Sequence, residues 1–396
     1  MTERKPRCER MMISSRTLRD AAGHLYAYLL KEHWNGHALA GPDSGIRFNA
    51  RIGRFIKSYL DFLPCQDSHI YLQGQGYWIL SSWLMADLRG DEQCKEIALL
   101  CSNYVLAIQR PEGYWEYPNP EWKGRIATVE GNLATLGLLE SYCRTRQESL
   151  LVGAKNWYRF LINGVGFQGG DGVLAVNYFA NVPSAMVPNN TTLTLLTLAK
   201  LADATGDDQY LALGKSMVAW LRQVQLVAGE LPYAVETSER KGRRHYLCYQ
   251  YNAFEFLDLA QYYRITGDQA VWPVLEKLAV FLSDGISESG AARHDCHRDG
   301  TEVPYYTAAV AAALSQATVL GVGNLRSLAD RAYRRVLSQQ RTDGGIEFFS
   351  RGDYGLLTDR GSYPRNLSMI LYHLLLELQV HAHHSMSSHS STGALT

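Results

Sequence analysis

Two glutamates near the expected starts of helices are the first candidates for chemistry. Glu130 lies in TVEGNLATL and Glu255 in YQYNAFEFLD, each at the beginning of an apolar stretch with helical periodicity. A carboxyl group in this position can act as a general acid or base, because burial and the helix N-terminus tune its pKa. Each has a structural alternative: Glu130 as an acid that stabilises its own helix dipole, and Glu255 as a buried acid bonded to Tyr251 on the same helix face.

The last helical stretch begins with Tyr363, Arg365 and Asn366. Tyrosine can donate or abstract a proton when a sugar is epimerised or undergoes elimination, so we predict Tyr363 to be catalytic. Arginine binds a carboxylate through two parallel hydrogen bonds, so we predict that Arg365 and the adjacent Asn366 bind substrate. The structural alternative pairs Arg365 with Asp359.

One loop carries four adjacent reactive side chains, His294-Asp295-Cys296-His297. A zinc site needs more widely spaced ligands and a second segment that supplies the others. We therefore predict Asp295 to be a catalytic acid, with an ordinary polar loop and a metal site as the alternatives, and we assign neither a metal ligand nor a cofactor.

Glycine-rich loops and first turns carry further polar and aromatic residues that could bind substrate. The chain has 24 tyrosines and 8 tryptophans, many of them in these loops. Two carboxylates roughly 5–9 Å apart would support glycosidase chemistry. Aromatic rings could stack on sugars, anchor loops or line an isoprenoid pocket. Besides Arg365 and Asn366, the predicted substrate-binding residues are Asp67, His69, Trp115, Asp171, Asn190, Tyr251, Asn252 and Tyr306.

The elements that carry these residues recur with nearly constant spacing. Apolar helical stretches start near residues 69, 126, 189, 247, 305 and 363. The steps are roughly 57–63 residues and each holds a second helix, which is typical of repeated helical hairpins. Turns such as Thr205-Gly206-Asp207 place a glycine after one helix and an aspartate cap before the next.

Six such hairpins, with Ser15–Trp34 pairing with the last one, predict a single all-α (α/α)6 toroid. The first helix of each pair is the more apolar and is expected in the inner ring. Turns within a pair are short, whereas the loops to the next pair run to about 15–25 residues. All the long loops then lie on one face, and we predict a pocket there over the N-terminal ends of the inner helices.

Composition predicts the domain boundaries. Residues 1–14 are expected to form a loose leader, 15–380 the toroid, and 381–396 a disordered tail rich in histidine and serine. Ile46–Leu63 is expected to add one more helix, ended by Pro64.

Charge and cysteine usage exclude several classes of protein. Lys+Arg and Asp+Glu both number 39, so nothing favours a nucleic-acid partner. The seven cysteines include no CxxC pair, which indicates a reducing compartment, and we expect a cytoplasmic protein. No apolar run is long enough for a transmembrane helix, and no G-x-S-x-G or P-loop motif is present.

Two kinds of segment resemble known families. Gln109-Arg-Pro-Glu-Gly113-Tyr-Trp115 and Gln340-Arg-Thr-Asp-Gly344 resemble the Q-x-x-x-G-x-W repeats of squalene cyclases and protein prenyltransferases. Ala204–Leu221 resembles the hairpins of the six-hairpin glycosidase superfamily, which holds hydrolases, epimerases and polysaccharide lyases. Both resemblances imply the toroid, over about residues 65–380. The sequence departs from the isoprenoid enzymes because it has neither a D-x-D-D nor a DDxxD motif.

The sequence therefore predicts an enzyme that acts on a small-molecule or oligosaccharide substrate by hydrolysis, elimination or epimerisation. Polar first turns suit a polyhydroxylated substrate, and Arg365 suits a uronate. One alternative is an isoprenoid cyclase or prenyltransferase-like enzyme. The other is a non-catalytic toroid that binds glycan or protein. The sequence indicates no oligomeric state.

Overall fold

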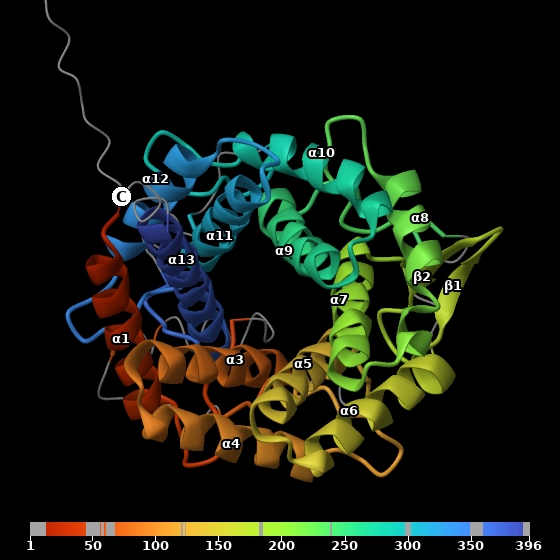
Figure 1. The fold of residues 1–396 in the computed structure, drawn as a ribbon, viewed down its shortest axis with the longest axis horizontal. Coiled ribbons are helices and arrows are strands. Elements are labelled where there is room, and N and C mark those ends of the chain that lie inside the picture. The colour runs from red at the N-terminus through yellow and green to blue at the C-terminus, as the bar shows by residue number, and fades with distance from the viewer. Residues whose placement is uncertain are drawn as a thin grey trace, which may run out of the picture.

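Two concentric rings of helices make up the molecule (Figure 1). The computed structural model describes residues 13–44, 56, 59–60, 68–119, 122, 124–181, 185–237, 240–297, 302–348 and 359–390, with side chains described up to residue 382. The inner ring consists of α3 (Leu72–Arg89), α5 (Thr128–Thr145), α7 (Pro188–Thr205), α9 (Cys248–Thr266), α11 (Pro304–Leu320) and α13 (Pro364–Ser390). The outer ring consists of α1 (Ser15–Glu32), α4 (Glu92–Ala107), α6 (Glu148–Phe160), α8 (Gly214–Val224), α10 (Trp272–Ser283) and α12 (Arg326–Leu337).

Each inner helix contacts the next, and α13 contacts α3, so the inner ring is closed. Helix α1 packs on α13 as the partner of the last hairpin. The predicted all-α toroid is therefore confirmed, with the first helix of each pair inside. In the pair α11–α12 the inner helix is the more apolar: its middle is almost entirely alanine and buried, whereas α12 exposes arginines on one face. The pair α9–α10 is the exception, because the outer helix α10 is the more apolar.

Short turns join each inner helix to its outer partner, as the sequence indicates. Gly206 and Gly267 end α7 and α9 in the left-handed conformation that glycine adopts most easily. Asp207 and Asp268 then cap η3 (Asp208–Leu211) and η4 (Gln269–Val271), which lead into α8 and α10. After α11 the capping glycine is Gly321, not the expected Gly323-Asn324 turn, because the helix ends at Leu320.

Three Gln-x-x-x-Gly segments join neighbouring outer helices. Each glutamine donates its Nε2 hydrogen to the carbonyl of the glycine four residues later and to a carbonyl of the next outer helix. Gln109 bonds to Gly113 and Gly153 in α6, Gln225 to Gly229 and Val274 in α10, and Gln340 to Gly344 and Ala21 in α1, all at 2.8–3.1 Å. These motifs, two of which resemble the squalene cyclase repeats, therefore have a structural role in this chain.

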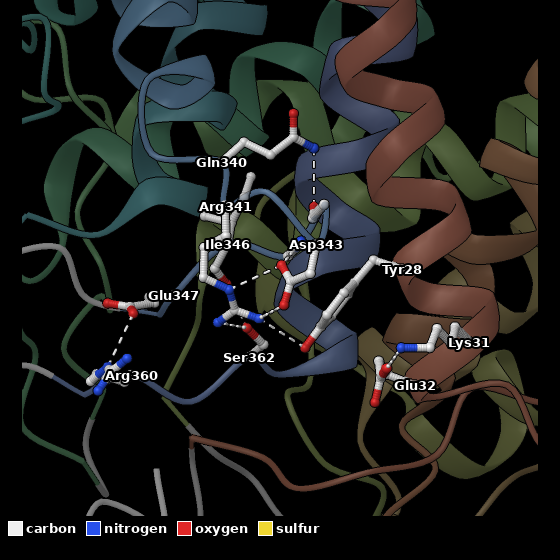
Figure 2. Close-up of polar contacts among 12 residues, drawn as sticks. Tyr28, Lys31, Glu32, Gln340, Arg341, Asp343, Ile346, Glu347, Arg360 and Ser362 are labelled. Atoms are coloured by element: carbon white, nitrogen blue, oxygen red, sulfur yellow. Dashed lines mark hydrogen bonds and ion pairs between the residues drawn. The ribbon is translucent and has the colours of Figure 1, made fainter. Parts of the chain in front are cut away.

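The last of these segments closes the outer ring. Figure 2 shows Arg341 reaching from the Gln340 loop to Asp343 and to the hydroxyl groups of Tyr28 and Ser362. Tyr28 lies on α1, so the first and last parts of the toroid are held together by these contacts.

A small hairpin interrupts one of the long loops. Strand β1 (Phe167–Gly170) pairs antiparallel with β2 (Val173–Val176), with Phe167 opposite Val176. The sequence predicted an irregular loop here. The Asp171-Gly172 turn, with both residues at positive φ, closes the hairpin, which projects from the outer edge of the ring (Figure 1).

The ends of the toroid differ from the expected boundaries. Helix α13 continues to Ser390, so the disorder expected from residue 381 does not hold for residues 381–390. His381 explains the first part of this extension, because its ring nitrogens lie 3.0 Å from the Ser15 hydroxyl and 3.0 Å from Glu377. At the other end, Ser14 of the expected leader caps α1.

The predicted helix Ile46–Leu63, the predicted leader and the end of the predicted tail fall mostly on residues that the structure does not describe. Most of Ile46–Leu63, all of 1–12 and all of 391–396 lie outside the described residues. None of the helices in the described ranges is long and apolar enough to cross a membrane.

We predict that Gly229→Ala destabilises the fold more than Gly206→Ala does. Both glycines have positive φ, so each substitution should cost about 1–2 kcal/mol for the left-handed backbone. A Cβ atom at Gly229 would also lie 2.4 Å from the Lys277 carbonyl oxygen, whereas one at Gly206 meets nothing within 4 Å. The close contact should add about 1–3 kcal/mol in urea unfolding. Equal losses for the two variants would contradict this role of the motif.

Candidate active site at the N-terminal ends of the inner helices

Half-buried polar side chains from the first turns of the inner helices gather on the face that carries the long loops. They include Gln73 of α3, Tyr251 of α9, Tyr305 of α11 and Arg365 of α13. The Arg365 guanidinium donates to Gln73 Oε1 at 2.9 Å, which links α13 to α3 at this face. The charge of Arg365 also lowers the pKa of Tyr305, against the larger effect of burial, so these groups lie close together.

Glu130 in the first turn of α5 caps the neighbouring helix α3. Its Oε2 accepts the backbone N–H of Gln73 at 3.1 Å, and the N–H of Leu72 also points to the carboxyl. These are the first two amides of α3, whose own N-cap residue Tyr71 supplies no side-chain acceptor. Glu130 therefore lies in the first turn of its own helix, as its structural alternative requires, and it also caps the neighbouring helix α3.

The environment of Glu130 makes its carboxyl titrate near neutrality. The side chain is 1% exposed, and burial raises its pKa from the ordinary 4.5 to about 7. Arg365 and the two α3 amides oppose this effect, because they stabilise the charged form. Near pH 7 the group can therefore both donate and accept a proton, as a general acid or base must.

Arg365 is held by Asp43, a residue that the sequence analysis did not identify. Its Nε and NH2 atoms donate to the two Asp43 carboxylate oxygens at 2.7 and 3.0 Å. The guanidinium also lies 4.8 Å from the centre of the Tyr71 ring. The alternative prediction, that Arg365 pairs with Asp359, is wrong, because Asp359 accepts a hydrogen bond from the Tyr363 hydroxyl at 2.7 Å. Asp43 could be found only by knowing that α13 closes on the N-terminal segments.

Aromatic rings surround this group of residues. Ring pairs with centroids 4.6–5.8 Å apart come from four long loops and from inner-helix N-termini. They are Tyr71–Tyr117, Tyr117–Trp122, Tyr178–Phe179, Tyr233–Tyr251 and Tyr305–Tyr306. The charge of Glu130 raises the pKa of both Tyr117 and Tyr178, in addition to the larger effect of burial, so both rings are within electrostatic reach of this carboxyl.

Four of the predicted site residues instead hold the fold. Trp115 is buried and donates its Nε1 hydrogen to the Val105 carbonyl at 2.8 Å. Asn252 bonds to both backbone groups of Leu231, and Tyr363 is buried with its hydroxyl on Asp359. Asp295 accepts the His297 N–H at 2.8 Å and so shapes its own turn. These contacts give each of the four residues a structural role that requires no substrate.

Three predicted residues lie beside the cluster. His69, together with Asp43 and Arg365, lines a cavity of only about 10 Å³. Asn366 accepts the Ser44 hydroxyl at 3.5 Å, and Tyr306 is buried against Tyr305.

The other predicted residues lie apart or have no described contact. Asn190 is buried in α7, and neither of its side-chain polar atoms has a hydrogen-bond partner among the described residues. Asp171 is exposed at the turn of the β1–β2 hairpin. This hairpin lies at the outer edge of the ring (Figure 1), away from the N-terminal ends of the inner helices. Asp67 lies outside the described residues.

Glu255 lies deeper in the ring, next to an acid that the sequence analysis missed. Burial raises the pKa of Glu255 well above its ordinary value, and Asp258 adds to the effect. Burial likewise raises the pKa of Asp258, although its Oδ2 accepts the Thr192 hydroxyl at 3.1 Å. Asp258 could have been found as the acid three residues after Glu255, on the same side of one helix.

A cavity of about 430 Å³ lies inside the ring among the middle and C-terminal parts of the inner helices. The predicted pocket belongs to the opposite face, so this cavity was not foreseen. Leucines are the commonest residues in its wall, which also carries Tyr77, Tyr372 and charged side chains such as Asp258. Within this wall Arg264 donates to Gln316 at 2.5 Å. Its leucines include Leu80, Leu84, Leu133, Leu136, Leu139, Leu193, Leu196, Leu257 and Leu376.

Comparison with known proteins supports the fold assignment. A family model described as a domain of unknown function (DUF6288) matches residues 175–333. No curated protein matches the chain. The chain is similar in structure to a possible member of the GH105 family from Salmonella enterica, with TM-score 0.67, 13% identity and coverage of 95% of this chain and 96% of that one.

Two further solved structures share the architecture. Cellobiose 2-epimerase from Bacillus thermoamylovorans matches with TM-score 0.72 and 12% identity, over 92% of this chain and 100% of the epimerase. The GH76 α-mannanase of Bacteroides thetaiotaomicron matches with TM-score 0.65 and 13% identity, over 92% and 96%. The chain therefore has the α/α-toroid fold of glycosidase-like proteins over nearly its whole length.

We predict that the stability of wild-type protein relative to Glu130→Gln falls as pH rises. The folded protein binds the Glu130 proton more tightly than the unfolded chain between pH 4.5 and 7, so ionisation in this range destabilises the fold. The glutamine keeps an oxygen acceptor for α3 and cannot ionise. Denaturant unfolding across this range should show a relative change of up to about 3 kcal/mol. A pH-independent difference would show that Glu130 titrates normally.

Proposed function

We propose that this chain is an enzyme that acts on a carbohydrate by proton transfer, with Glu130 as the general acid or base. The observation that carries the proposal is a carboxyl group with a pKa of about 7 at the loop face of the ring. It lies beside Arg365 and among half-buried tyrosines, where a polyhydroxylated molecule would meet both hydrogen-bonding groups and ring faces.

The surroundings of Glu130 suit a sugar. Aromatic rings offer flat apolar faces to the C–H side of a sugar ring, and their hydroxyl groups offer hydrogen bonds. Arg365 uses three of the five N–H donors of its guanidinium on Asp43 and Gln73, which leaves two for a substrate. A uronate carboxylate or a pair of hydroxyl groups would accept these bonds.

The names of the similar structures support the same substrate class. They include a cellobiose 2-epimerase, an α-mannanase, and a polysaccharide lyase that matches with TM-score 0.65 and 9% identity. Hydrolysis, elimination and epimerisation each need a group that moves a proton at the sugar ring, and Glu130 would supply it here.

Substrate access requires movement of side chains in the long loops. Glu130 is 1% exposed, so a sugar reaches it only if neighbouring groups shift. Tyr117 and Tyr178 interact with it electrostatically, are half-buried and come from loops. We assign these two tyrosines the role of admitting the substrate and then stacking on it.

We expect Glu130→Gln to lower kcat/KM by about 10²–10⁴-fold on whichever saccharide the wild type converts. Uronate-containing and neutral oligosaccharides are screened with wild-type protein by chromatography of the products. If Glu130 acts as a base, wild-type kcat/KM rises with pH and levels off above about pH 7; if it acts as an acid, it falls through the same range.

Asp171→Asn is the matched control, since it makes the same acid-to-amide change on the exposed hairpin turn. It should keep full activity. Undiminished turnover by folded Glu130→Gln would overturn the assignment of Glu130, and conversion of no saccharide would overturn the substrate class.

The leucine-lined cavity favours a second candidate, an enzyme or binding protein for an isoprenoid. Its volume of about 430 Å³ and the leucines in its wall suit a short hydrocarbon chain, although charged side chains such as Arg144 and Lys200 also line it. Farnesyl diphosphate and squalene, tested with and without magnesium, should then raise the Tm of wild-type protein but not of Leu136→Trp, which fills the cavity. No shift with either ligand would exclude this candidate.

A further inference from the structure

Sulfur and nitrogen atoms from separate segments meet beside the N-terminus of α9. The Cys296 Sγ atom lies 3.4 Å from Cys248 Sγ and 3.0 Å from His245 Nδ1. Cys248 Sγ lies 3.9 Å from the same nitrogen. Cys248 is buried, whereas the other two side chains are partly exposed, so solvent ions can reach the cluster.

A buried carboxyl group lies next to the histidine of this cluster. Glu230 Oε1 lies 3.8 Å from His245 Nδ1, and the residue is 4% exposed. Its Oε2 atom has no hydrogen-bond partner among the described residues. A buried carboxylate oxygen without a partner is costly, and a cation in the cluster would remove that cost.

We propose that His245, Cys248 and Cys296 bind a zinc ion, with Glu230 as the fourth ligand. Tetrahedral zinc, with bonds of about 2.3 Å to sulfur and about 2.0 Å to nitrogen, needs ligand atoms roughly 3.3–3.8 Å apart. The separations of 3.0, 3.4 and 3.9 Å need only small adjustments to meet this. Thiolate and imidazole ligands select zinc over magnesium or calcium.

The backbone brings the ligands together from three directions. Leu247 has φ +47°, an uncommon conformation for a branched residue, and it turns the chain between His245 and Cys248. The loop that carries Cys296 is fixed by the Ala292 N–H on the Thr307 hydroxyl at 3.1 Å and by the Arg293 N–H on the Gly285 carbonyl at 2.8 Å.

The segment 294–297 alone lacks the second ligand-bearing segment of a zinc site, so the sequence favours a catalytic acid or a polar loop over a metal site there. The structure supplies the second segment that such a site requires, through the His-x-x-Cys spacing at the start of α9. In the part of the chain that the structure describes, no other group of three such side chains lies close enough to hold a metal. The inference does not depend on the proposed sugar chemistry.

The test is the metal content of the full chain, expressed without an affinity tag and dialysed against a metal-free buffer. Elemental analysis should find one zinc per chain in wild type and almost none in Cys248→Ser or Cys296→Ser. Cys143→Ser, which removes an exposed cysteine, and His383→Ala/His384→Ala, which alters the C-terminal segment, should both keep the zinc.

A second measurement covers the case in which the serine variants fail to fold. Cobalt(II) added to metal-free wild type should give the intense charge-transfer absorption of thiolate-bound cobalt, and zinc should displace it. Absence of both bound zinc and this absorption would overturn the proposal. A disulfide between Cys248 and Cys296 would instead leave denatured wild type with two thiols fewer than its seven cysteines, with none missing among the six left in Cys248→Ser or Cys296→Ser or among the five left in the double variant. Thiol titration that gives these values would be inconsistent with zinc and would assign the two cysteines to a disulfide.

Discussion

The amides at the start of a helix need hydrogen-bond acceptors, and six inner helices start on the same crowded face. Helix α3 obtains its acceptor from outside, because the carboxyl of Glu130 on α5 receives the N–H of Gln73. This position buries the carboxyl and raises its pKa to about 7. The interaction that stabilises one inner helix against the next therefore also creates the group best suited to transfer a proton.

The same first turns hold the loops around that group. Gln75 of α3 bonds to both backbone groups of Leu39 at 2.8 Å, and Asn252 of α9 does the same for Leu231. Arg365 of α13 fixes Asp43 in the segment before α3. Side chains near the helix starts thus position the backbone of the loops, and several of these loops carry the aromatic rings. In the proposed site these contacts hold most groups in place, and Tyr117 and Tyr178 are the groups that we propose to move.

Much of this organisation follows from the sequence, because each turn carries a local signal. Turns such as Gly267-Asp268 determine the period, and the period assigns Glu130 and Arg365 to first turns on one face. Asp43 was missed because it is 322 residues from Arg365 and meets it only when the ring closes. Trp115 is predicted to bind substrate and Tyr363 to be catalytic because residue type does not reveal which way a side chain points. Both are buried in the fold.

The most direct test of the account is a crystal structure of Glu130→Gln soaked with the saccharide that stabilises it most. The account predicts density for a sugar ring over the N-terminal ends of the inner helices, stacked on Tyr117 or Tyr178 and hydrogen-bonded to Arg365. Residue 130 should lie within hydrogen-bond distance of the sugar. A sugar bound elsewhere, or a ligand found only in the leucine-lined cavity, would contradict the assignment of this face as the active site.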